Sequence, residues 1–406
     1  MMNNTHLSRE AGRSQGAVLV LGSSLTIMGS VMVAPIIPKL IEEFAPSGPR
    51  VDLLVSLAIA GPALAIAIFA PLAGWLADSL GRKRMLVFAT LLYALLGAAP
   101  ALLDGLQSIV IARFLFGVSE AMVMTCCTAL IADYWQGERR LRYINAQVIS
   151  IALVGSLFFV IGGALGEQSW RTPFYLYLLP LLLIIPMIKV LWEPLAQGRH
   201  DDVPDTKRID WVALVIGYVL IFGGMLLSFV VPLQTPVMMV QLGIASSTLI
   251  GMATGTGLLA SLLGALAWPL IRKTIGIKCT NALLLGLMSS GLLLLITANS
   301  LMGIFIAVIT HGVGTGLLVP NALSPIMNAL NKRQNGRGVG GFTSCLYLGQ
   351  FISPLCVAFL VSMTGGLTHA IGMLALIGFG ASVAWLMYAF FAKQGDTPHL
   401  TTTAEE

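Results

Sequence analysis

Residues 74–84 read Gly-Trp-Leu-Ala-Asp-Ser-Leu-Gly-Arg-Lys-Arg. They form a charged interruption between two long apolar runs, at about 53–77 and 85–103. Each run is long enough to cross a bilayer as a helix, which takes roughly 17 to 25 residues. Gly81 can adopt backbone angles that are closed to other residues, so the chain can turn sharply there. The stretch predicts a tight polar turn between two membrane-spanning helices.

The composition extends this reading to the whole chain. Of 406 residues, 57% are hydrophobic and 10% are charged, against roughly 25% charged in soluble domains. We therefore expect an all-α integral membrane protein. The net charge of +5 lies in short loops and does not indicate nucleic-acid binding. The sequence shows no metal-ligand spacing, phosphate-binding loop or nucleophile constellation, and it has no room for an ATPase domain. We expect no enzyme activity, no cofactor and no metal.

Twelve apolar runs are long enough to span a bilayer. The cations fall mostly in alternate loops, which places both termini in the cytoplasm by the positive-inside rule. The polar stretch after the sixth run predicts a cytoplasmic linker at 193–210 between two six-helix halves, residues 1–192 and 211–406. The predicted spans are 16–38, 53–77, 85–103, 107–133, 142–166, 173–192, 211–232, 243–270, 279–298, 301–330, 338–363 and 368–391.

The two halves repeat each other at an offset of 195 residues. Ile111-Ala112 and Gly117-Val118 match Ile306-Ala307 and Gly312-Val313, and Gly81 matches Gly276. Duplicated six-helix halves are an architecture of transporters that bind substrate near the bilayer midplane.

Glu120 is the only carboxylate deep inside an apolar run, and no Asp or Glu occurs between Asp210 and Asp396. Arg113 lies seven residues earlier on the same helical face. An ionised group at the middle of a bilayer is costly and often marks a transport path or a proton relay. Glu120 is thus the proposed proton carrier, or else a polar residue that stays protonated. Arg113 either contacts substrate or holds the bundle, through helix carbonyls or Gln147.

Further polar and aromatic residues are candidates for the site. His311 titrates near neutral pH when unperturbed, so it is either a second proton-coupling group or a buried packing residue. Aromatic side chains in the fifth and eleventh runs, and an amide in the tenth, could line an apolar substrate cavity. These candidates are Phe158, Phe159, Asn321, Tyr347 and Phe351.

The turn at 74–84 closely resembles the signature loop of the major facilitator superfamily, G-x-L-A-D-x-x-G-R-[KR]-[KR]. Arg113-Phe114-x-x-Gly117 is similar to its R-x-x-Q-G motif, with Phe116 in place of Gln. The proline pair Pro35 and Pro38, and Gly162-Gly163 followed by Trp170-Arg171-x-x-Phe174, resemble the twelve-span drug:proton antiporter branch. Phe158-Phe159 stands where that branch has Gly-Pro, and the first span carries no acidic residue.

The resemblance implies a conformational latch at the cytoplasmic face. Gly74 and Gly81 belong to the signature turn, and its acid, Asp78, is expected to face the start of the eleventh helix near Gly338. Arg82 is expected to pair with Asp133, beside a second charged turn that contains Arg139. These contacts would join the two halves and stabilise an outward-open state.

The sequence thus predicts a secondary transporter that works by alternating access in the bacterial inner membrane. The favoured activity is proton-coupled export of a small amphipathic or apolar compound, with substrate, protons and lipid as partners and the monomer as the working unit. Two alternatives stay open: symport or facilitated uptake of a small polar or anionic metabolite bound by Arg113, and a transporter-like receptor or structural protein.

Overall fold

The computed structural model describes residues 11–48, 51–194, 209–330 and 335–395. All regular structure in these ranges is helical. The α-helices are α1 (Arg13–Val31), α2 (Ile37–Phe44), α3 (Val51–Leu80), α4 (Arg82–Ala98), α5 (Leu106–Tyr134), α6 (Gly137–Gly166), α7 (Leu181–Val190), α8 (Trp211–Gln241), α9 (Ser247–Thr297), α10 (Leu301–Ala329), α11 (Asn335–Thr364) and α12 (Leu367–Gly395). Short 3₁₀ turns lie between them at Ala34–Ile36, Ala45–Ser47, Ala99–Leu102 and Thr172–Leu178.

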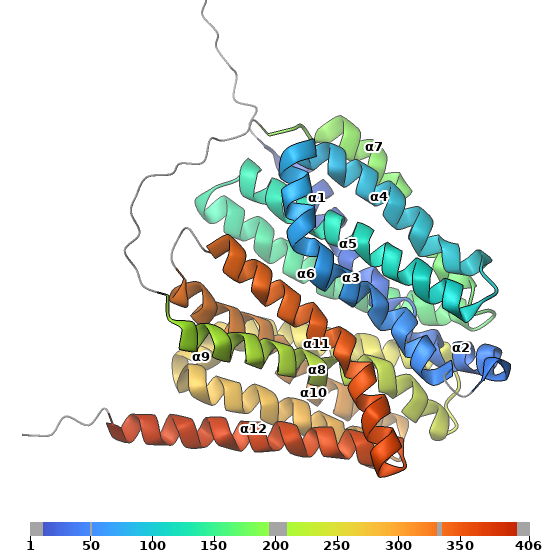
Figure 1. Cartoon of the computed structure of the whole chain (residues 1–406), viewed down its shortest axis with the longest axis vertical. Coiled ribbons are helices and arrows are strands. Elements are labelled where there is room, and N and C mark those ends of the chain that lie inside the picture. Colours follow the sequence, from blue (N-terminus) through green and yellow to red (C-terminus); the bar gives the residue numbers. More distant parts are fainter. Residues whose placement is uncertain (1–10, 49–50, 195–208, 331–334, 396–406) are drawn as a thin grey trace, which may run out of the picture.

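The helices form two groups. Figure 1 shows α1 to α7 on one side of the molecule and α8 to α12 on the other, with α11 crossing the boundary and α12 at the outer edge. The buried apolar side chains form two matching cores. One draws on residues 18–191 and adds Phe229 and Leu233 of α8, and the other draws on residues 214–375. We call these groups the N-terminal and C-terminal halves; most of the predicted linker lies outside the described residues.

Eleven helical segments in the described ranges are long and apolar enough to cross a membrane. The predicted runs 243–270 and 279–298 both lie in the 51-residue helix α9, where Gly276 interrupts the helical backbone with φ 75° and ψ 172°. Gly312 of α10 lies against Gly257, whereas Gly314 lies against Met288. A straight helix would separate these two α9 positions by about 46 Å. The chain therefore reverses direction at Gly276, with no loop between the two arms.

The internal repeat is visible in close helix contacts. A Cβ added to Gly117 would lie 2.5 Å from the backbone of Pro62, and one added to Gly312 would lie 2.2 Å from the Gly257 oxygen. Gly155 packs against Ile27, and Gly349 packs against the Phe222 backbone. In each pair of contacts, corresponding residues are 194 or 195 positions apart. Small residues allow this close approach between membrane helices.

The halves meet at one end of the bundle. Gly163 and Gly251 bring α6 and α9 together, since an added Cβ would lie 2.2 Å from the oxygens of Ser247 and Phe159 respectively. The opposite end, which we call the cation-rich end, holds Arg82, Arg139 and Lys273. Near the middle, the Ser344 hydroxyl donates to the Ala67 oxygen at 2.9 Å. Beyond that contact, toward the cation-rich end, no hydrogen bond or ion pair between described residues joins the halves.

Candidate functional site

The Glu120 carboxyl lies inside the N-terminal half, where α5 passes α1. Its side chain is 3% exposed. A Cβ added to Gly29 would lie 2.8 Å from Glu120 Oε2 and 3.0 Å from the Phe116 ring, so the carboxyl fills the space that glycine leaves. Glu120 makes no hydrogen bond to any described residue. Burial of a charge without a partner costs several kcal/mol. The site therefore favours the neutral acid until the environment changes.

Arg113 lies next to this carboxyl but is held by helix oxygens. Its guanidinium is fully buried and donates to the Ala58 oxygen at 3.0 Å, to the Tyr177 hydroxyl at 3.3 Å and to the Gly29 oxygen. The Phe116 ring covers it, with 4.7 Å from Cζ to the ring centroid. Arg113 and Glu120 therefore both approach Gly29, Arg113 through its oxygen and Glu120 beside its Cα, and they form no ion pair with each other. Of the two partners considered for Arg113, carbonyls are observed and Gln147 is not.

The C-terminal half approaches Glu120 through α11. The Tyr347 hydroxyl lies 3.3 Å from the sulfur of Met124, which is one helical turn beyond Glu120 on α5. Phe351, one turn further along α11, packs against the N-terminal core. Tyr347 and Phe351 were predicted to line a substrate cavity. The structure places Tyr347 near the buried carboxyl and Phe351 against the N-terminal core, and their role toward substrate stays a prediction.

The charged turn at 78–82 forms a network within the N-terminal half. Arg82 contacts Asp78 at 2.8 Å and Asp133 at 2.5 Å. Gly81 supplies the expected turn with φ 95°. Glu193 was not predicted as part of this network. Its carboxylate accepts from the backbone N–H groups of Arg82 and Lys83, at 2.5 and 3.1 Å, where the start of α4 favours negative charge.

Other predicted latch contacts are not formed in this arrangement. Asp78 is 61% exposed and its ion pair is with Arg82, with no bond to the described part of α11. Arg139 is exposed and forms no ion pair with a described residue. A Cβ added to Gly74 would meet nothing closer than 3.9 Å. Among the described residues, this network lies within the N-terminal half, and its role as a latch between the two halves stays a prediction.

His311 is buried between α10 and the second arm of α9. Its Nδ1 lies 2.9 Å from the Met288 oxygen, so the proton on that nitrogen is donated to the carbonyl. Nε2 faces α8 near the Ser228 backbone but makes no hydrogen bond of normal geometry to a described residue. This packing matches the alternative reading of a buried core histidine; proton coupling by His311 stays a prediction.

The other residues predicted to line a substrate cavity contact protein groups in this structure. Asn321 is fully buried, and its amide bonds to Trp268 Nε1 at 3.0 Å, the Ile277 oxygen at 3.3 Å and Asn281 Oδ1 at 2.6 Å. It thereby holds both arms of α9 across the Gly276 turn. Gln147 donates to Ser23 Oγ at 2.5 Å. Phe158 and Phe159 pack against the N-terminal core. None of these contacts requires a substrate.

A second charged contact, absent from the predictions, joins the halves at the end opposite the cation-rich end. Glu167, just after α6, accepts from the Ser246 hydroxyl at 2.5 Å and from the Thr248 N–H at 2.9 Å. Lys39 Nζ donates to the Gly166 and Glu167 oxygens at 2.7 and 2.6 Å. The Ser246 hydrogen bond, with the Thr248 bonds and the charge of Lys39, lowers the pKa of Glu167. Its ionised carboxylate therefore adds a hydrogen-bonded link between the halves at this end.

Two packed helical halves, joined at one end and carrying one buried carboxyl near their boundary, define a multi-span membrane transporter. The sequence model that describes the Major Facilitator Superfamily matches residues 19–235, which is more than half of the chain. The chain belongs to this superfamily. It is a transporter and not an enzyme.

Curated relatives match over most of the sequence. Multidrug resistance protein 1 of Bacillus subtilis (strain 168) is 24% identical over 381 residues, which cover 91% of this chain and 95% of the relative. Quinolone resistance protein NorA of Staphylococcus aureus is 26% identical over 350 residues, covering 83% and 87%.

Solved structures share the fold at lower identity. The inward-facing, unoccupied bacterial homolog of the human lysosomal transporter Spinster aligns with a TM-score of 0.69 at 14% identity, covering 94% of this chain and 96% of that one. A peptide transporter POT in complex with sulfate aligns with a TM-score of 0.74 at 13% identity, covering 93% and 95%.

Proposed function

We propose that this chain exports small amphipathic or apolar compounds in exchange for protons, by alternating access. The observation that carries the proposal is the Glu120 carboxyl, which is buried between α1 and α5, has no hydrogen-bond partner among the described residues and lies close to Tyr347 of the other half. The two curated relatives are named for multidrug and quinolone resistance. Their names support a drug-like cargo for this chain.

The coupling would work through the cost of an unpaired charge. In the arrangement described above, Glu120 is dry and favoured as the neutral acid. When the halves separate along α11 and water reaches the carboxyl, hydration stabilises the charged form and the proton leaves. Substrate and proton would then compete for one site, which is the condition for antiport.

We further propose twelve spans, since the two arms of α9 pack antiparallel around Gly276. The division into residues 1–192, 193–210 and 211–406 follows the two cores. Both termini would lie in the cytoplasm of a bacterial inner membrane, and one copy would suffice for transport. With that orientation, the cation-rich end is cytoplasmic, and the described conformation is inward-facing and closed outside by Glu167.

The alternative of uptake of an anionic metabolite has less support. Arg113 was its proposed ligand. Each nitrogen of that guanidinium already donates to a protein oxygen, and the rings of Phe116 and Tyr177 lie against it. These bonds use three of the five N–H groups of the guanidinium, and the side chain is fully buried, so an anionic metabolite would have to displace protein groups to reach it. An apolar cargo needs no such ligand.

The test is transport by the full chain in inside-out vesicles, followed with a panel of fluorescent amphipathic dyes. We expect dye accumulation in the vesicles when the lumen is acidic, and loss of accumulation when an ionophore collapses the pH difference. Vesicles without the protein are the control for dye partitioning. Dye movement down its own gradient with no pH dependence would replace antiport with facilitated passage.

A further inference from the structure

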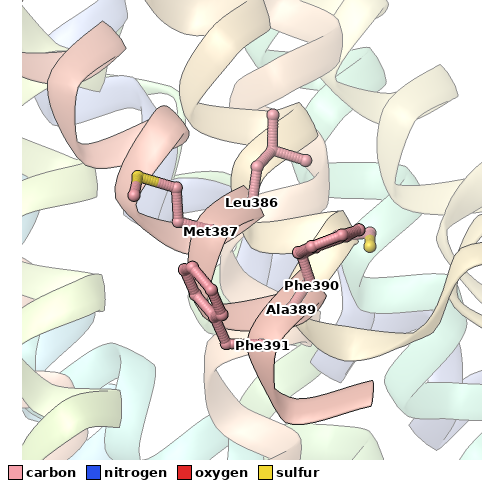
Figure 2. Close-up of a pocket in the computed structure, with 6 residues that line it drawn as sticks. Leu386, Met387, Ala389, Phe390 and Phe391 are labelled. Carbon is pink, nitrogen blue, oxygen red and sulfur yellow. The ribbon is translucent and has the colours of Figure 1, made fainter. Parts of the chain in front are cut away.

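A groove on the outer surface of the C-terminal half lies between the α9 turn and the end of α12. Its volume is about 480 Å³, within the range of about 300 to 1,000 Å³ that is usual for small-molecule sites. Figure 2 shows Leu386, Met387, Phe390 and Phe391 of α12 around it, and Cys279 of α9 completes the wall. Phe390 and Phe391 are 62% and 60% exposed. The groove is therefore open toward the surrounding lipid.

A cation lies at the edge of this groove. Lys278 precedes the wall residue Cys279, and its Nζ lies 4.1 Å from the ring centroid of Tyr388, which stands between two residues of the other wall. Lys278 makes no hydrogen bond or ion pair with a described residue. Lys273, five residues earlier on the same turn, is exposed and likewise unpaired among the described residues.

The positive charges of Lys273 and Lys278 have no acidic residue near them in the sequence. No Asp or Glu occurs between Asp210 and Asp396, so the cations of α9 have no acid among residues 211–395, and Lys278 has no ion pair in the described part of the chain. In the N-terminal half, by contrast, Arg82 has two carboxylates as partners. An unpaired ammonium at the level of a polar headgroup region attracts anionic lipid.

A second groove provides an internal comparison. It has a volume of about 450 Å³ and is lined by Leu165, Thr172, Tyr175 and the leucines at 176, 178, 179 and 182. The nearby cation, Arg171, is already used: it pairs with Asp104 at 2.9 Å and donates to two backbone oxygens. The two grooves are alike in size and apolar lining. They differ in the nearby cation: Lys278 at the first groove has no ion pair with a described residue, whereas Arg171 at the second is already paired.

We propose that the groove between α9 and α12 binds an anionic phospholipid, with an acyl chain along Leu386, Met387 and Phe390 and the phosphate at Lys278. Lys273 adds a second positive charge at the headgroup. The occupant is a lipid and not a soluble anion, because the walls are apolar and open to the bilayer. The site is separate from Glu120 and requires no particular transport mechanism.

The test measures lipid retained by the purified full chain. The protein is exchanged into detergent with equal phosphatidylglycerol and phosphatidylcholine of identical chains, and bound lipid is counted by native mass spectrometry. We expect selective retention of phosphatidylglycerol. Lys278→Gln should reduce it about fivefold, the factor expected for one juxtamembrane cation, with phosphatidylcholine unchanged. Arg84→Gln removes an exposed charge from the corresponding region of the other half and should change neither.

The groove is tested separately from the charge. Met387→Trp fills it at a half-exposed position and should reduce retention of both lipids, whereas Leu179→Trp in the second groove should leave the phosphatidylglycerol preference intact. Circular dichroism checks that each variant is folded. Equal phosphatidylglycerol retention by Lys278→Gln and wild type would overturn the proposal, and so would displacement of the lipid by inorganic phosphate, which would indicate a soluble-anion site.

Discussion

The corresponding turns at Gly81 and Gly276 have similar backbones and opposite chemistry. Both glycines have positive φ, 95° and 75°. Around Gly81 the contacts are ionic and partly exposed, with Arg82 between Asp78 and Asp133. Around Gly276 they involve no carboxylate: the buried Asn321 amide bonds to residues on both arms of α9, and Lys278 lies against the Tyr388 ring. The repeat fixes where the chain turns, and the side chains decide whether the turn can change its partners.

This difference extends to the halves as a whole. All carboxylates of the membrane-spanning region lie before Asp210. Exposed ion pairs exchange readily because each contributes about 1 kcal/mol or less, whereas buried amide networks are costly to open. We infer that the N-terminal half carries the groups that respond to protons and conformation, while the C-terminal half is the more rigid partner.

The largest effect is expected at Glu120. Glu120→Gln keeps the size of the side chain but removes the titrating proton, so gradient-driven transport should fall to the level of empty vesicles. Thr315 occupies the corresponding position in the C-terminal repeat, and Thr315→Val is the matched control. It should leave coupling intact. The measurement is dye flux under an imposed pH difference; coupled flux in the Gln variant would move the proton site elsewhere, with His311 the next residue to test.

The second effect concerns the buried amide network. Asn321→Leu leaves Trp268 Nε1 and Asn281 Oδ1 without their partner, and each buried unsatisfied group costs about 1–3 kcal/mol. We expect a lower thermal unfolding midpoint in detergent. Thr274→Val, on the same turn but exposed and bonded only within its own helix, should leave the midpoint near that of wild type. An unchanged midpoint for Asn321→Leu together with weaker dye binding would instead assign Asn321 to the cavity.

The sequence predicted the parts of this molecule that follow from local pattern. Apolar runs and the Gly81 turn are encoded by consecutive residues, and the Arg82–Asp133 pair came with the family resemblance. Contacts between distant segments were not encoded locally. Nothing in the sequence spacing brings Gly29 between Arg113 and Glu120, or Glu193 to the start of α4. One signal was available for Glu193: a carboxylate following the sixth span on the side where α4 begins with free N–H groups.

The third effect is smaller and concerns the ionic turn. Asp133→Asn weakens the pair with Arg82 and should change the transport rate by about three- to tenfold, since 1.36 kcal/mol corresponds to a factor of ten. The unfolding midpoint and equilibrium dye affinity should stay near wild type. Asp104→Asn removes a 94%-exposed acid from the other ion pair and serves as the control. A large loss of affinity in Asp133→Asn would mean that the turn contacts substrate rather than biasing conformation.

The smallest effect is expected at Glu167 and depends on pH. Because hydrogen bonds from Ser246 and Thr248 hold the pKa of Glu167 below its usual value, the ionised form is the one that closes this end. Its contribution is complete above the pKa of the unfolded chain and is lost as the pH falls through the lowered pKa of the folded state. Acid should therefore separate α6 from α9 here.

Spin labels introduced at Leu165 and Ala245, with Cys279, Cys345 and Cys356 replaced by Ser, would report the distance between them. Glu167→Gln should show part of the acid-induced separation already at neutral pH, and Asp52→Asn, which removes another carboxylate near the same end, should not. If the distance widens in acid equally in wild type and Glu167→Gln, a group other than Glu167 holds this end together. Ionic contacts that respond to pH or conformation would then be confined to the turn around Gly81.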